Sequence, residues 1–250
     1  MTPLAVFLHT VLVVALGPVL SGLIRMAASG GGLKALVEPT RAVSAGLRAS
    51  GQPPLGKLAV LSLAVVAGLL IPLFSSDAVL GFLGDGFTAL LLLTGLSLGR
   101  LPLRLSTVLA VAASLWAMGT LTGSTDLAQA LANWEAGPAT LLITIGLALS
   151  VAPVMTPEDL PRADLSDAVE AWTRGTLRLG WLAFSMMAFP VTIPLTGGLT
   201  FAAALAVFLA KFGIFGTLFA PFPIRWPKMP LAEVGLACSL LALGLAKLGI

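Results

Sequence analysis

The stretch PLAVFLHTVLVVALGPVLSGLI, residues 3–24, contains no charged side chain. A helix of about 20 apolar residues is long enough to cross the hydrocarbon core of a bilayer. Seven further stretches are similarly apolar, which gives eight candidate spans near residues 4–24, 57–74, 78–99, 103–122, 138–156, 176–195, 199–219 and 229–249. The sequence therefore predicts an all-α fold, a polytopic membrane bundle of about eight transmembrane helices.

The composition of the whole chain agrees with a membrane protein. The 250 residues are 58% hydrophobic and 10% charged, whereas a soluble domain has about 25% charged residues. Mean hydropathy is +1.03. No basic segment precedes the first apolar run and no small-residue cleavage site follows it, so we expect a retained first span. We expect residues 1–250 to form a single membrane domain.

Basic residues are concentrated in alternate loops between the predicted spans. The opposite loops contain Asp77, Asp126 and Glu135 and no Lys or Arg. The positive-inside rule therefore predicts that the basic loops face the cytoplasm and that both termini lie on the other side of the inner (plasma) membrane. The net charge of +3 is explained by this topology and by lipid contact, not by nucleic-acid binding. The basic loop residues are Arg25, Lys34, Arg41, Arg48, Lys57, Arg100, Arg104, Arg162, Arg174, Arg178, Arg225 and Lys228.

Two segments are too polar to be spans. In GLKALVEPTRAVSAGLRAS, residues 32–50, apolar residues recur at roughly helical intervals with charges between them, and Pro39 interrupts the pattern. This indicates an amphipathic helix on the cytoplasmic interface. Residues 124–134 predict a shorter surface helix on the opposite face. Within the third span, Gly95 and Gly99 form a GxxxG pattern, which is typical of close helix packing.

Two ionisable residues fall inside predicted spans, where a charge is costly. Lys211 lies in the middle of FAAALAVFLAKFGIFGTLFA (201–220), and Asp85 lies about a third of the way into the third span, between Gly84 and Gly86. Such residues either pair with neighbours and lock helix packing or form a proton relay. The sequence leaves both interpretations open.

The densest polar segment is TPEDLPRADLSDAVEAWTRGTLR, residues 156–178. If a helix begins near Asp167, then Asp167 and Glu170 form a capping box, and two arginines follow on the same face. The alternative is a proton entry or a surface for partner docking. The charged residues concerned are Glu158, Asp159, Asp164, Asp167, Glu170, Arg174 and Arg178.

The sequence offers little for metal or cofactor chemistry. One cysteine, Cys238, and one histidine, His9, cannot supply an iron–sulfur cluster, a zinc site or two axial haem ligands. Nucleotide-binding and metalloprotease motifs are absent as well. We therefore expect no metal site, no cofactor and no catalytic residues in this chain.

Three segments resemble the family of the complex I heel subunit, NADH dehydrogenase subunit 1. The likeness is closest to the membrane anchor subunit of group 4 membrane-bound nickel–iron hydrogenases of the hydrogenase-4 and formate hydrogenlyase type. LVEPTRAVSAGLR (36–48) keeps Pro39 and Arg41 of a Gln-Pro-Tyr-Arg-Asp segment, with Ala42 in place of its Asp. FLAKFGIFG (208–216) carries Lys211 as a seventh-span segment of the family does. Asp85 matches an Asp that opens the third span.

The third segment, LPRADLSDAVE (160–170), resembles the family's acidic Leu-Pro-Val-Asp-Asp-Pro-Ala-Thr-His-Leu-Glu. It places Pro161, Asp164 and Glu170 on matching positions. A His-Glu pair expected after this segment aligns with Gly175 and Thr176. These departures favour a diverged hydrogenase-type or related member over a true complex I subunit.

The resemblance implies a non-catalytic subunit of a respiratory-chain type oxidoreductase complex. Such a subunit anchors the hydrophilic electron-transfer arm and couples its chemistry to proton or sodium translocation, without requiring a quinone. Its implied partners are iron–sulfur and hydrogenase- or dehydrogenase-like subunits, antiporter-like membrane subunits and the lipid bilayer. The alternatives are a stand-alone secondary transporter and a purely structural membrane anchor. The implied ion path is Asp85, Lys211, Glu170 and Asp164, and the implied docking residues are Arg41, Glu158, Asp159, Asp167, Arg174 and Arg178.

Overall fold

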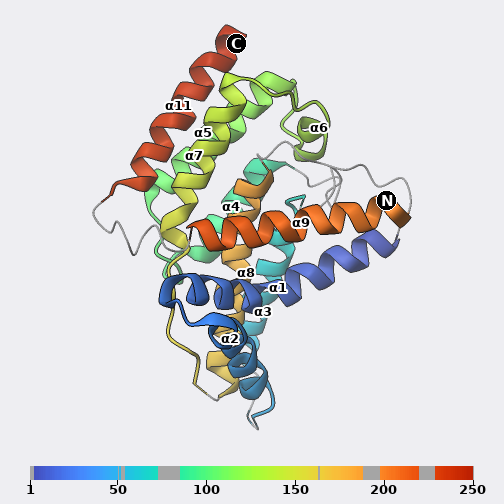
Figure 1. The fold of residues 1–250 in the computed structure, drawn as a ribbon, viewed down its shortest axis with the longest axis vertical. Helices are drawn as coiled ribbons and strands as arrows, with labels where there is room; N and C mark the ends of the chain where they lie inside the picture. Colours follow the sequence, from blue (N-terminus) through green and yellow to red (C-terminus); the bar gives the residue numbers. More distant parts are fainter. Residues whose placement is uncertain are drawn as a thin grey trace.

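The computed structural model describes residues 3–49, 51, 54–72, 85–162, 164–187, 198–219 and 229–249. These ranges are almost entirely helical and contain no strand, so the all-α class is confirmed for them. One isolated antiparallel bridge joins the backbones of Asp85 and Asp126. The helices, labelled as in Figure 1, are α1 (Pro3–Ser29), α2 (Gly32–Leu47), α3 (Leu55–Leu69), α4 (Gly86–Ser97), α5 (Leu105–Thr122), α6 (Leu127–Ala132), α7 (Pro138–Val151) with the 3-10 turn η2 (Ala152–Val154), α8 (Leu165–Met187), α9 (Gly198–Phe219) and α11 (Leu231–Leu248).

Every apolar stretch predicted as a span overlaps one of these helices, and the two surface segments correspond to α2 and α6. Among the described residues, three helices are long and apolar enough to cross a membrane, at Phe7–Ser29, Leu105–Thr122 and Leu231–Leu248. Shorter apolar helices cover Leu55–Leu69, Gly86–Ser97, Pro138–Val154 and Ala202–Thr217. The chain thus has the character of a membrane protein, whereas the number of eight crossings stays a prediction. Parts of the third and sixth predicted spans lie outside the described residues.

Helix α8 lies at the centre of the bundle (Figure 1) and packs against α1, α2, α3, α4, α7 and α9. Its residues from Gly175 to Met187 are all buried. Helices α5, α7 and α11 form a second group, joined by a hydrogen bond of 2.8 Å between the hydroxyls of Ser114 and Ser239. α7 and α11 approach closely because Gly146 and Gly235 have no side chain at the crossing.

One close helix crossing next to α8 lies at glycines that the GxxxG pattern does not include. A Cβ atom added to Gly175 on α8 would lie 2.5 Å from the carbonyl oxygen of Gly17 on α1. A Cβ atom on Gly95 would meet no described atom within 4 Å, and Gly99 lies beyond the end of α4 with φ of +74°. The described residues therefore place close packing at Gly17 and Gly175.

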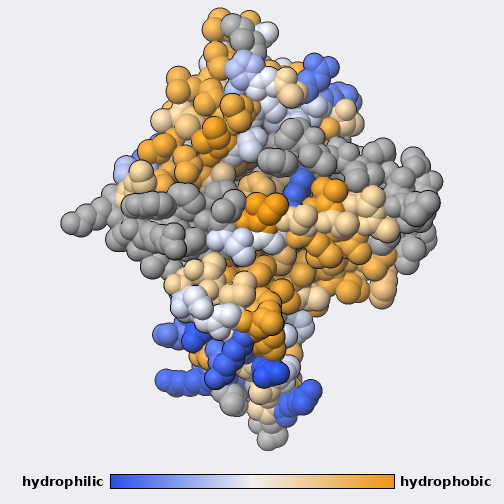
Figure 2. Space-filling model, in the orientation of Figure 1, coloured by the Kyte–Doolittle hydropathy of each residue, from blue (hydrophilic) through white to orange (hydrophobic). Residues whose placement is uncertain are grey.

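Basic residues of loops predicted on one side of the membrane contact other segments predicted on or near that side. Lys57 donates to the carbonyl oxygen of Ser166 at 3.3 Å, and Arg104 pairs with Glu233 at 3.4 Å. The backbone bridge between Asp85 and Asp126 joins the start of α4, predicted inside the third span, to a residue of a loop predicted on the opposite side. Hydrophilic side chains gather at the lower end in Figure 2, where α2 and the start of α8 lie.

Candidate functional site

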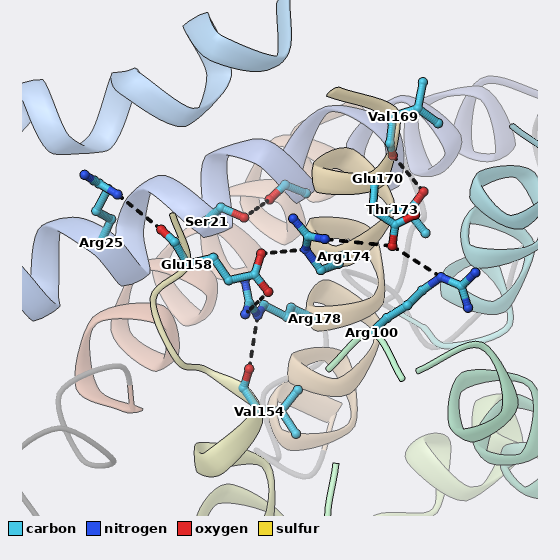
Figure 3. A network of polar contacts seen from close by, with 11 residues as sticks. Ser21, Arg25, Arg100, Val154, Glu158, Val169, Glu170, Thr173, Arg174 and Arg178 are labelled. Atoms are coloured by element: carbon cyan, nitrogen blue, oxygen red, sulfur yellow. Dashed lines mark hydrogen bonds and ion pairs between the residues drawn. The ribbon is translucent and has the colours of Figure 1, made fainter. Parts of the chain in front are cut away.

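The candidate site is a set of alternating arginines and glutamates at the predicted cytoplasmic end of α8 (Figure 3). We call it the Arg–Glu network, and it consists of Arg100, Glu158, Glu170, Arg174 and Arg178. At its centre, the Glu158 carboxylate accepts hydrogen bonds from Arg174 Nε at 2.7 Å and from Arg178 Nη2 at 2.6 Å. One carboxylate thus holds two guanidinium groups.

A second carboxylate extends the network toward the loop between α4 and α5. Glu170 Oε1 lies 3.4 Å from Arg100 Nε and 3.8 Å from Arg174 Nη1. Arg174 therefore contacts both glutamates, at a shorter distance to Glu158. With three arginines and two glutamates, the network has a net charge of +1 and alternates in sign along its length, which reduces repulsion between like charges.

Local sequence accounts for both halves of the network. Glu170, Arg174 and Arg178 follow one another at intervals of four, so a helix presents them on one face, and the predicted Glu170–Arg174 pair is confirmed. Glu158 comes from the chain before α8. Prolines at 153, 157 and 161 disfavour continuation of a helix there, and residues 155–162 are non-helical and run beside α8.

The burial of Arg178 makes this arrangement obligatory. Its side chain is 1% exposed, and a charged group that has lost its contacts with water needs hydrogen-bond or ion-pair partners within the protein. Besides Glu158, the Arg178 Nε donates to the carbonyl oxygen of Val154 at 3.1 Å. The other charged side chains of the network are 20–30% exposed. The network therefore has one buried end and one end that solvent or a partner can reach.

Two charged residues of neighbouring helices, Arg25 and Glu38, extend the network, and their positions in the sequence indicate only topology and the surface of an amphipathic helix. Arg25, at the end of α1, donates to the main-chain oxygen of Glu158 at 3.1 Å and lies 3.7 Å from Glu38 of α2. Arg100 was likewise counted only as a loop charge. One feature of the sequence does indicate this contact, because Arg25, Arg100 and the acidic loop are all predicted on the same side of the membrane.

Asp164 has a local role that corrects the expected start of α8. The helix begins at Leu165, and Asp164 Oδ1 accepts a hydrogen bond from the backbone N–H of Asp167 at 2.8 Å. The expected capping box of Asp167 with Glu170 is therefore wrong, because Asp164 provides the cap three residues earlier. Glu170 is left available for the arginines.

Asp85 also acts as a helix cap. Its carboxylate accepts hydrogen bonds from the N–H of Thr88 at 3.1 Å, the hydroxyl of Thr88 at 3.0 Å and the N–H of Phe87 at 3.4 Å. We expected Asp85 about a third of the way along a helical span, but α4 begins only at Gly86. The cap explains this start, since a side-chain acceptor satisfies the first free N–H groups.

Lys211 lies on α9 and reaches the far part of α8. Its Nζ is 3.4 Å from the main-chain oxygen of Met186, and the side chain is partly buried. The ammonium group is thus directed toward the centre of the bundle. Asp85 caps the start of α4, whereas Arg100 of the Arg–Glu network follows the other end of that helix.

Two surface pockets flank the segment that carries Glu158. The larger, of about 580 Å³, lies between α1, α2 and this segment, and the other, of about 440 Å³, is lined by most of the Arg–Glu network. Asp159 lines both pockets and is exposed, Asp167 lines the second, and Arg41 lies exposed on α2. The predicted docking residues other than Arg41 therefore gather around one acidic segment.

The described residues contain no group of three or more His, Cys, Asp or Glu side chains that could hold a metal ion. Comparisons with protein-family models and with curated proteins find no match to the chain. The class of protein is therefore argued from the site itself.

Proposed function

We propose that this chain is the membrane subunit of a complex I-like, hydrogenase-type redox complex. In this proposal it anchors a hydrophilic electron-transfer arm and couples electron transfer to proton or sodium translocation. The observation that carries the proposal is the Arg–Glu network, which joins an exposed acidic segment to the buried body of α8.

The packing of α2 on α8 supports this proposal. Two of the segments that resemble the hydrogenase family, 36–48 and 160–170, are far apart in sequence but contact each other. A Cβ atom on Gly46 of α2 would lie 2.7 Å from the carbonyl oxygen of Asp164 and 2.5 Å from the Cβ of Ala168. Two of the resembling segments therefore meet at one site, as a shared docking surface would require, whereas the third, 208–216, lies on α9.

The proposed coupling element is Arg174, because it contacts two carboxylates at unequal distances. Electron transfer at a docked arm changes the charge next to Glu158 and Asp159, which line both surface pockets. A change in charge there shifts the balance of Arg174 between Glu158 and Glu170. Such a two-state contact is the physical requirement for coupling between sites.

Helix α8 gives this change a route into the membrane. It runs without interruption from Glu170 to Met186, whose carbonyl oxygen receives the contact from Lys211. In the proposed ion path, Glu170 and Lys211 exchange protons through buried water. Asp85 and Asp164 were candidates for the same path, but their carboxylates accept backbone hydrogen bonds as helix caps.

One observation favours the second candidate function, a purely structural membrane anchor. Each glutamate of the Arg–Glu network is paired with two arginines, so the network also stabilises the bundle without any ion movement. A stand-alone transporter is the third reading.

Copurification after mild solubilisation separates these functions. We expect the tagged chain to bring down iron–sulfur and antiporter-like membrane subunits. A chain that is isolated alone and still transports ions in vesicles would contradict the proposal. Replacing Glu170 by Gln should then reduce ion translocation per electron transferred far more than it reduces the yield of assembled complex. Equal loss of both would indicate the structural anchor.

A further inference from the structure

Helix α2 has an outer face that the Arg–Glu network does not use. Its inner face consists of Ala35, Pro39, Val43 and Gly46, which are buried because α2 packs on α1 and α8. This contact fixes the rotation of the helix about its axis. The residues that point away from the bundle are therefore determined by the fold.

The outer face repeats one pattern every seven residues. Three pairs of neighbouring residues recur at intervals of two helical turns, namely Leu33–Lys34, Thr40–Arg41 and Leu47–Arg48. The basic members of the pairs therefore form one row along the helix, and the first members form a parallel row. Leu33 is 77% exposed, and Val37 and Leu47 are 38% and 39% exposed. The exposed apolar side chains of Leu33, Val37 and Leu47 thus lie beside the basic row, on the same stripe of the helix as the polar Thr40.

The three basic residues of this row differ from the arginines of the site. Arg25, Arg100, Arg174 and Arg178 all pair with glutamates. Lys34, Arg41 and Arg48 are exposed, and none of them forms an ion pair with an acidic side chain in the described part of the chain, although Lys34 also lines the larger surface pocket. Their charges are therefore available to an external anion.

We propose that the outer face of α2 is a binding surface for anionic phospholipids of the cytoplasmic leaflet, with headgroup phosphates on Lys34, Arg41 and Arg48 and acyl chains beside Leu33, Val37 and Leu47. Adjacent apolar and basic rows are the composition by which helices bind an anionic membrane surface. The charge complementarity favours lipid over a soluble acidic protein, which would leave the apolar row in water. This inference does not depend on the proposed redox function.

The test uses the full chain in lipid nanodiscs, with Cys238→Ser and a fluorophore on Thr40→Cys, which lies between the two outer pairs. Quenching is compared between nitroxide-labelled phosphatidylglycerol and nitroxide-labelled phosphatidylcholine at equal content. We expect phosphatidylglycerol to be preferred about fivefold or more, since one basic residue near an anionic surface contributes about that factor. High salt should reduce the preference.

The triple variant Lys34→Gln, Arg41→Gln, Arg48→Gln should lower the preference to about one, and Arg41→Gln alone should give an intermediate value. Arg162→Gln, an exposed charge outside α2, serves as the matched control and should leave it unchanged. Equal quenching by the two lipids in the unsubstituted chain would overturn the proposal, as would a preference that survives the triple variant. Absence of quenching by either lipid in the native complex would show that a protein covers the face, which also overturns it.

Discussion

The guanidinium of Arg178 is 1% exposed, and its partners come from residues 154–158, about twenty positions earlier in the chain. The sequence alone identifies Glu158, Arg174 and Arg178 as candidate site residues, because charged residues at the end of an apolar span are easily recognised. It could not pair them, since the path of the chain before α8 is set by tertiary packing. Interactions within a helix are easier to predict because they depend on sequence spacing alone, and the predicted i,i+4 pair of Glu170 and Arg174 is confirmed.

The first prediction at this scale concerns Glu158. Replacement by Gln leaves Arg178 buried with a neutral partner, and loss of one member of a buried pair costs about 3–5 kcal/mol. Because Glu158 is 28% exposed, water can replace part of the loss, and we expect the lower end of this range. Thermal unfolding in mild detergent measures the effect. Asp159→Asn, an exposed neighbour, is the control and should change the unfolding free energy by less than about 0.5 kcal/mol. Similar unfolding of the two variants would contradict the assigned pairing.

The second prediction concerns Lys211. An ammonium group in the middle of a span costs about 2.5–3.5 kcal/mol, so its retention requires a role or a partner. Under the proposed function, Lys211→Met should abolish ion translocation coupled to electron transfer while the complex remains assembled. Lys247→Met, at the end of α11, is the control and should preserve coupling. If Lys211→Met prevents assembly but the residual complex couples normally, then Lys211 is structural and the relay is wrong.

At the scale of the element, the positions of the helices were predictable and their contacts were not. Apolar runs and charges fix where a helix lies, as α2 and α6 illustrate, because both properties are local. The starts of α4 and α8 were missed, since capping by Asp85 and Asp164 depends on which turn the backbone takes. The GxxxG pattern of Gly95 and Gly99 does not mark a helix contact among the described residues. A small residue permits another helix to approach closely, but it does not determine which helix does so.

The third prediction tests the crossing of α1 and α8. Gly175→Ala places a Cβ atom 2.5 Å from the carbonyl oxygen of Gly17, so the two backbones must separate, and we expect a destabilisation of about 1–3 kcal/mol. Gly95→Ala is the matched control. It meets no described atom and should stabilise the chain by up to about 1 kcal/mol, since Ala favours helix over Gly. Unfolding midpoints in detergent compare the two variants. A neutral Gly175→Ala would refute the crossing.

At the scale of the whole molecule, the charge asymmetry of the loops and the contacts between loops agree. Arg25 and Lys57, from the first predicted cytoplasmic loop, and Arg100, from the second, all contact residues 158–170. The backbone of Asp126, predicted in a loop on the other side, meets that of Asp85 at the start of α4. The contacts agree with a shared side for the basic loops, and the assignment of that side to the cytoplasm is a prediction from the positive-inside rule.

The fourth prediction tests that assignment in sealed right-side-out vesicles, with Cys238→Ser as the background. Single cysteines replace Arg48 and Arg225 on the basic side, the latter outside the described residues, and Thr125 on the opposite side. We expect a membrane-impermeant maleimide to label Thr125→Cys at once, and to label the two basic-side cysteines only after permeabilisation. Labelling of Arg48→Cys from outside would reverse the topology. It would also place the Arg–Glu network on the outer surface, where no cytoplasmic electron-transfer arm could dock.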